Sequence, residues 1–167
     1  MKVIAVSGTP GTGKTILSKK LAKKLNYYYL DVNKLISKYK LSESYDKKRK
    51  TKIVNVKKLN KSLINEIKTM KNNVLTKKFK GIIIDSHLSH YLPRKYVDFC
   101  IVTKCGIKEL NKRLKKKKFD KRKINENLQA EIFDVCYNEA LGRKHEIIVV
   151  NTTKSINIST LAKKLGG

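Results

Sequence analysis

The chain has 167 residues, and its 40 Lys and Arg against 13 Asp and Glu give a formal net charge of +27. That length predicts one domain with a real hydrophobic core. No apolar run approaches the ~20 residues of a membrane span. The three cysteines are odd in number and form no CxxC pair, which argues against a disulfide framework or a zinc knuckle. We therefore expect a folded, very basic cytoplasmic protein with no membrane partner.

Short apolar runs alternate with segments of helical spacing along the first part of the chain. Residues 2–6 are apolar and end in Ser-Gly, which predicts a buried parallel strand. Apolar residues then recur at helical spacing over residues 16–25. A second strand is predicted at residues 27–30, with its tyrosines in the strand and core, and Asp31 can cap the short helix that follows. Residues 40–52 are polar and are expected to form a mobile segment.

The second half of the chain continues this alternation. The predicted elements are a helix at 59–70, strands at 82–85 and 97–103, helices across 107–142, a strand at 147–150 and a closing helix at 156–165. The long helical stretch is interrupted around residues 115–120. Strands that alternate with helices predict an α/β fold for residues 1–167, with three layers around a five-stranded parallel sheet.

Residues 8–15 read Gly-Thr-Pro-Gly-Thr-Gly-Lys-Thr and fit the pattern G-x-x-x-x-G-K-[ST] without a mismatch. In such a loop the backbone N–H groups surround a phosphate, and the following helix adds its positive N-terminal end. We expect Lys14 to reach the β- and γ-phosphates of ATP and the Thr15 hydroxyl to ligate Mg²⁺. The remaining expected nucleotide-binding residues of the loop are Gly8, Gly11, Thr12, Gly13 and Ile16.

A phosphate loop alone does not name a reaction. The chain is too short for most ATPase motors and has no obvious base-recognition motif of a GTPase. Its polar segment after the second strand and its interrupted late helix are typical of a nucleoside-phosphate kinase, which needs one flap over the acceptor and one over the donor to exclude water. We expect the acceptor flap at residues 31–56 and the lid at residues 115–123.

Three segments of the chain resemble one family closely. They are the phosphate loop at 8–15, the stretch Ile83-Ile84-Asp85-Ser86-His87 with Pro93 shortly after it, and residues 127–133 followed by Glu139-Ala140. Together they resemble the adenylate kinase isoenzyme 6 family, also called the coilin-interacting nuclear ATPase family, whose archaeal members are named adenylate kinases. The resemblance extends over nearly the whole chain.

This resemblance implies a P-loop kinase fold with strand order 2-3-1-4-5. It also implies a broad-specificity nucleoside monophosphate kinase, which converts ATP and AMP to two ADP, together with an intrinsic ATPase activity. The family further implies a role in late maturation of the small ribosomal subunit. A small-subunit ribosomal protein and pre-ribosomal RNA are the partners that such a role predicts.

Two positions depart from the family pattern. Family members usually carry an acidic cluster after the acceptor flap, where this chain has Asn55 within the stretch 53–57. They also usually have Arg-Gly-Tyr at the start of the lid, where this chain has Lys117-Lys118-Phe119. Because Lys cannot make the planar two-pronged contact that Arg makes with phosphate, these changes bear on phosphoryl transfer and acceptor fit more than on ATP binding.

Asp85 and His87 are the catalytic candidates besides Lys14. Asp85 ends an apolar strand, where α/β sheets place ligands, and we expect it near Mg²⁺ through a water; the alternative is an Asp that caps a loop. His87 can orient an attacking water or couple loop motion to hydrolysis, although a loop histidine without the resemblance reads as an ordinary surface residue. His90 and His145 receive no functional role.

Further candidates lie later in the chain. Arg113 and Lys117 flank the helix interruption and can cover the ATP phosphates or base when the lid closes; the alternative is a solvated helix face. Arg94 is a candidate contact to the transferring phosphate. Residues 151–153 follow the last strand, where they form either a cradle for adenine or a simple turn.

The positive charge is concentrated in the presumed flaps, at Lys47–Lys50 and at residues 115–118 and 121–123. Such clusters are either a solvated surface or a site that attracts phosphate backbones with salt-dependent affinity. The main prediction is the nucleoside monophosphate kinase. The alternatives are a ribosome-assembly ATPase switch with little kinase activity, and a basic RNA-binding module with a vestigial nucleotide site.

Overall fold

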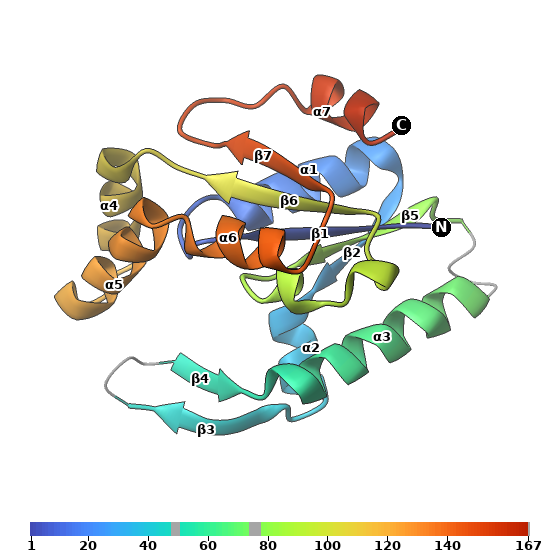
Figure 1. Ribbon diagram of the computed structural model, residues 1–167, viewed down its shortest axis with the longest axis horizontal. Coiled ribbons are helices and arrows are strands. Elements are labelled where there is room, and N and C mark those ends of the chain that lie inside the picture. The colour runs from blue at the N-terminus through green and yellow to red at the C-terminus, as the bar shows by residue number, and fades with distance from the viewer. Residues whose placement is uncertain (48–50, 74–77, 167) are drawn as a thin grey trace.

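The computed structural model describes residues 1–47, 51–73 and 78–166. A five-stranded parallel sheet runs through its centre, with helices on both faces (Figure 1). The strands of this sheet are β1 (Lys2–Gly8), β2 (Tyr27–Asp31), β5 (Gly81–Asp85), β6 (Phe99–Lys104) and β7 (Ile147–Asn151). Their order is β2-β5-β1-β6-β7, which is the expected order 2-3-1-4-5 when the five strands are numbered consecutively. The predicted α/β fold is confirmed.

Side chains on the two faces of the sheet build two separate hydrophobic clusters, because successive residues of a strand point to opposite sides. In β1, Val3 and Ala5 join one cluster, while Ile4 and Val6 join the other. The helices are α1 (Lys14–Leu25), α2 (Val32–Lys38), α3 (Val56–Asn72), α4 (Ile107–Lys116), α5 (Lys121–Ile132), α6 (Val135–Gly142) and α7 (Ile158–Lys164). Helices α2, α3 and α6 cover the first cluster, and α1 and α7 cover the second.

Most of the polar segment at residues 40–52 forms a β-hairpin rather than the irregular segment that the sequence predicts. Strand β3 (Ser42–Asp46) pairs antiparallel with β4 (Thr51–Val54), and the hairpin projects away from the central sheet (Figure 1). Sequence patterning missed these strands because β3 buries no face against the core, so it carries no apolar alternation. Of the basic cluster expected at the flap, residues 48–50 lie outside the described residues.

The late helical stretch breaks twice. The predicted interruption is present between α4 and α5, where Lys118 adopts a left-handed conformation with φ of 56° and Asp120 caps α5 by accepting from the backbone N–H of Lys123. The sequence did not predict the second break, at Asp134 with φ of 52°, because no Gly or Pro marks it. Among the residues that the structure describes, no helix is long and apolar enough to cross a membrane.

The fourth strand of the sheet, β6, begins two residues later than expected. Residues 94–96 form a turn of 3₁₀ helix, and the strand proper begins at Phe99. Asp98 lies at the bend between them, and its carboxylate accepts a hydrogen bond of 2.7 Å from the backbone N–H of Val3. The backbone N–H of Asp98 also donates to the carbonyl of Val3 at 2.8 Å. A side-chain bond and a backbone bond together therefore tie the start of β6 to β1.

Candidate active site

The phosphate loop connects β1 to α1 at the carboxyl end of the sheet. Gly8 is required there, because its φ is 135° and a Cβ at this position would collide with the side chain and carbonyl of Thr103 on β6. The Thr12 hydroxyl donates to the Thr9 carbonyl at 2.8 Å and pairs with the Thr103 hydroxyl at 2.6 Å. These bonds hold the phosphate loop against the neighbouring strand β6.

Lys14 extends across the mouth of this loop. Its ammonium donates to the carbonyls of Gly8, at 2.7 Å, and of Thr9, at 3.0 Å. Burial lowers the pKa of Lys14 to about 8, while nearby groups, Asp85 among them, act in the opposite direction. A phosphate oxygen in the loop would compete with the two carbonyls for the same ammonium protons.

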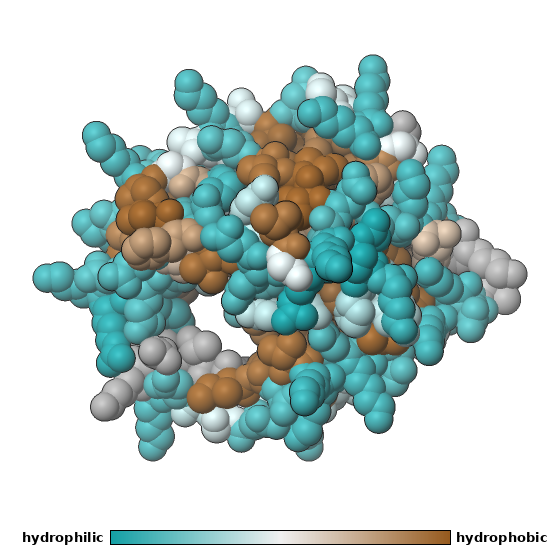
Figure 2. All heavy atoms as spheres, viewed as in Figure 1, coloured by the Kyte–Doolittle hydropathy of each residue, from teal (hydrophilic) through white to brown (hydrophobic). Residues whose placement is uncertain are grey.

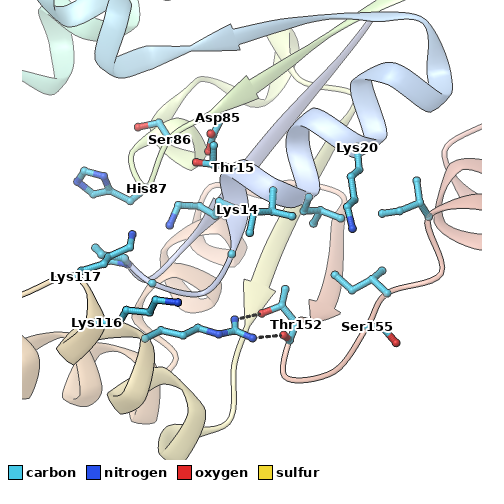
Figure 3. Close-up of a pocket in the computed structure, with 18 of the residues that line it drawn as sticks. Lys14, Thr15, Lys20, Asp85, Ser86, His87, Lys116, Lys117, Thr152 and Ser155 are labelled. Atoms are coloured by element: carbon cyan, nitrogen blue, oxygen red, sulfur yellow. Dashed lines mark hydrogen bonds between the residues drawn. The ribbon is translucent and has the colours of Figure 1, made fainter.

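Thr15 and Asp85 lie side by side at one wall of the cavity (Figure 3). Asp85 is buried at the end of β5, and its Oδ2 accepts a hydrogen bond of 2.8 Å from the phenol of Tyr29. Burial and the Asp85 carboxylate raise the pKa of Tyr29, so the phenol is a neutral donor. A hydroxyl and a carboxylate are hard oxygen ligands, so this pair fits Mg²⁺.

His87 lies on the rim of the same cavity, two residues beyond Asp85. Its side chain is exposed while it lines the cavity. Packing at the cavity wall and the nearby Lys14 ammonium lower its pKa to about 4. The imidazole is therefore neutral at pH 7, with a ring nitrogen able to accept a proton or a hydrogen bond.

The opposite wall of the cavity comes from α4 and the loop after β7. The Arg113 guanidinium donates to the carbonyl of Thr152 at 2.8 Å, and its Nε donates to Glu109 at 2.9 Å. Lys116 and Lys117 line the same wall from the end of α4. The Thr152 hydroxyl donates to the carbonyl of Thr12, so the loop after the last strand is tied directly to the phosphate loop.

The structure brings most of the expected site residues to a single cavity of about 790 Å³. The sequence-predicted residues that line it are Gly11, Gly13, Lys14, Thr15, Ile16, Asp85, His87, Arg113 and Lys117. Gly8 and Thr12 shape the loop behind it. Arg94 does not line it, and its guanidinium donates instead to the carbonyl of Val97 at 2.6 Å.

Several lining residues were not expected from the sequence. They are Pro10, Leu17, Lys20, Asn33, Ser86, Lys116, Lys154, Ser155, Ile156 and Ile158, besides Thr152 from the expected loop. Most of these side chains lie on helix faces or in loops that contain no sequence motif. The sequence pattern therefore does not indicate that they line the cavity. A rule that ligands bind beyond the carboxyl ends of parallel strands would have found Ser86 and the loop after β7.

Two buried networks support the cavity from behind. Glu131 on α5 accepts from the Thr9 hydroxyl at 2.6 Å and from the backbone N–H of Cys105 at 2.8 Å. His90, expected to have no role, is buried with Nδ1 at 2.6 Å from the Ser7 hydroxyl and Nε2 at 2.9 Å from Glu139. Both networks hold residues next to the phosphate loop, and neither lines the cavity.

The fold and the phosphate loop define a P-loop protein with the three-layer architecture of nucleotide kinases. The family model described as an AAA domain (AAA_18) matches residues 4–134. A protein of Methanocaldococcus jannaschii named "Putative adenylate kinase" is 38% identical over 148 residues, which cover 89% of this chain and 77% of the relative. A protein of Methanosarcina acetivorans with the same name is 35% identical over 154 residues, covering 90% and 77% of the two chains. The chain belongs to this adenylate-kinase-like family of P-loop proteins.

Solved structures agree on the fold. Deoxyadenosine kinase from M. mycoides with bound dATP superimposes with a TM-score of 0.58 at 18% sequence identity, covering 100% of both chains. The same enzyme with bound dCTP gives a TM-score of 0.56 at 18% identity, covering 98% of both chains. The chain therefore shares the kinase architecture with proteins that are distant from it in sequence.

Proposed function

We propose that this chain transfers the γ-phosphoryl group of MgATP to a nucleoside monophosphate, with AMP as the preferred acceptor. The observation that carries the proposal is the single cavity of about 790 Å³, which gathers Lys14, Thr15 and Asp85 with the cations of α4. The family supports it as well, since the two relatives described above are named adenylate kinases.

In phosphoryl transfer the protein takes little part in the covalent chemistry. Catalysis therefore comes mostly from positioning the substrates and from stabilising the charge of the transition state. The backbone N–H groups of the phosphate loop and the Lys14 ammonium would hold the β- and γ-phosphates. Thr15 would ligate Mg²⁺ and Asp85 would accept from a metal-bound water, and the bound ion would neutralise charge that develops between the phosphates. Arg113 and Lys117 face the cavity from α4 and would supply positive charge around the donor.

The acceptor would enter between the two flaps. We assign the acceptor flap to residues 31–56, which include α2 and the hairpin, and the lid to residues 115–123, between α4 and α5. Figure 2 shows a gap in the surface between the hairpin side and the α4–α5 side of the molecule. Asn33, on α2, reaches the cavity wall from the acceptor flap.

ATP hydrolysis is the second candidate activity, and His87 is the observation that favours it. A neutral imidazole at the cavity rim can orient a water toward the γ-phosphate. By resemblance to the isoenzyme 6 family, such hydrolysis would control binding to a small-subunit ribosomal protein and pre-ribosomal RNA. The net charge of +27 suits a partner made of nucleic acid.

The stoichiometry of ATP consumption separates the two activities. The purified chain would be incubated with MgATP, with and without AMP, and ADP and inorganic phosphate would be quantified by chromatography and a phosphate assay. A kinase yields two ADP per ATP and no phosphate, whereas hydrolysis yields one of each. Lys14→Ala is the control for contaminating enzymes. AMP-independent release of phosphate as the dominant reaction would contradict the kinase proposal.

A further inference from the structure

The Tyr29 side chain contacts Asp85, one of the two residues proposed to hold Mg²⁺. It lies in the middle of β2, beside β5, in the register Tyr29 to Ile83 and Asp31 to Asp85. Its ring packs, partly buried, against the cluster under α1. The phenol thereby donates a hydrogen bond of 2.8 Å to Asp85 Oδ2.

The chemistry of the two groups fixes the direction of this bond. A phenol has one proton, and the Asp85 carboxylate can only accept, so Tyr29 donates to Asp85. The bond fixes the orientation of the carboxylate, which lines the cavity together with Thr15.

We propose that Tyr29 is a positioning residue for the metal site, which holds the Asp85 carboxylate in place through Oδ2. The inference rests on the proposed function, because it takes Thr15 and Asp85 as the residues that hold Mg²⁺. It assigns to β2, an edge strand, a role in nucleotide chemistry.

The test removes the phenol oxygen and keeps the ring. Tyr29→Phe is compared with Tyr28→Phe, which loses the same atom from the same strand but packs on the opposite face of the sheet, against Phe79. Nucleotide affinity is measured by calorimetry in EDTA and in saturating Mg²⁺, and Mn²⁺ binding in the presence of ATP is measured by electron paramagnetic resonance.

We expect Tyr29→Phe to weaken Mn²⁺ binding about tenfold, the usual effect of losing an outer-shell partner of a metal ligand. ATP affinity in EDTA should be unchanged, and Tyr28→Phe should behave like the parent in every measurement. Equal metal affinity in both variants would overturn the inference. So would an equal loss of ATP affinity with and without metal, because that pattern indicates a general disturbance of the loop.

These readouts need neither an acceptor nor turnover. If the parent chain binds ATP with metal but never phosphorylates AMP, the proposed function fails and the role of Tyr29 is still decided by the metal measurements. If AMP is phosphorylated and the two variants have the same metal affinity, the proposed function stands and the role of Tyr29 is wrong.

Discussion

The phosphate loop changes the pKa of its own lysine, Lys14. Burial among the loop atoms lowers the pKa of this ammonium to about 8, and two backbone carbonyls accept its protons. The charged form is the one that phosphate oxygens attract. Because the group loses its charge as the pH rises through its pKa, nucleotide binding should depend on pH in the range where most lysines do not titrate.

We therefore expect the affinity for ATP to fall as the pH rises above about 8, since deprotonation of Lys14 removes the charge that faces the phosphates. Bound ATP favours the ammonium, so the midpoint in the complex should lie above that of the free protein. The dissociation constant would be measured by calorimetry from pH 7 to 9.5. Lys14→Met should bind more weakly at pH 7 and lose this dependence; an unchanged profile in the variant would contradict the assignment.

His87 should separate hydrolysis from phosphoryl transfer to AMP. The neutral ring at the cavity rim can orient a water, whereas an acceptor held in the flap needs no such help. For His87→Ala we expect ATP hydrolysis to fall by about 10²-fold, in the range of a lost general base, with ATP affinity kept. Asp85→Asn is the comparison, because it should impair both reactions. Parent-like hydrolysis by His87→Ala would show that the histidine has no such role.

At the scale of elements, side chains far apart in sequence attach the helices to the phosphate loop. Glu131, near the end of α5, bonds the Thr9 hydroxyl of the loop and the backbone at Cys105 after β6. Since α5 begins at the proposed lid, this carboxylate connects the lid helix to the phosphate site. His90 links α6 to the end of β1 in the same way, through Glu139 and Ser7.

Glu131→Ala should lower the free energy of unfolding by about 2–4 kcal/mol, because it leaves the Thr9 hydroxyl and a buried N–H without their acceptor. Glu126→Ala is the matched control on the same helix. It breaks an exposed i,i+4 pair with Arg122, which is worth about 0.5 kcal/mol or less. Urea unfolding followed by circular dichroism would measure both. Similar small effects for the two variants would contradict a structural role for Glu131.

At the scale of the whole molecule, the chain carries 40 basic residues against 13 acidic ones. Two residues of the cluster at residues 115–118, Lys116 and Lys117, line the cavity. Of the cluster at residues 47–50, Lys47 directly follows β3 and is not among the residues that line the cavity, while the other three lie outside the described part of the chain. The two clusters therefore differ in their relation to the nucleotide.

This difference predicts two distinct phenotypes. If RNA is a partner, binding of small-subunit ribosomal RNA should weaken steeply with salt, because lysines displace counterions from phosphates. Neutralising residues 47–50 with Gln should weaken RNA binding and leave ATP affinity near that of the parent. Neutralising residues 115–118 should weaken both. Filter binding at two salt concentrations and calorimetry with ATP would measure these effects, and RNA binding that is insensitive to the first cluster would rule out the RNA proposal for the hairpin.

The phosphate loop, the alternation of strands and helices, and the break before α5 could all be predicted from the sequence. Their signals are local: eight consecutive residues form the loop, and the apolar period of each segment depends on its own backbone geometry. The hairpin could not be predicted, because β3 buries no apolar face. The second break in the late helical stretch, at Asp134, could not be predicted either. An Asp in the left-handed conformation does not change the spacing of the apolar residues around it.

Only the tertiary structure decided which partners surround the loop. Tyr29 meets Asp85 across 56 residues, His90 meets Ser7 across 83, and Glu131 meets Thr9 across 122. Parallel strands and their crossover helices bring such residues together at the carboxyl edge of the sheet, whatever their distance along the chain. The sequence determined the phosphate-loop motif and its place between a strand and a helix, and the packing of β2, α5 and α6 around that loop decided which side chains hold it in place.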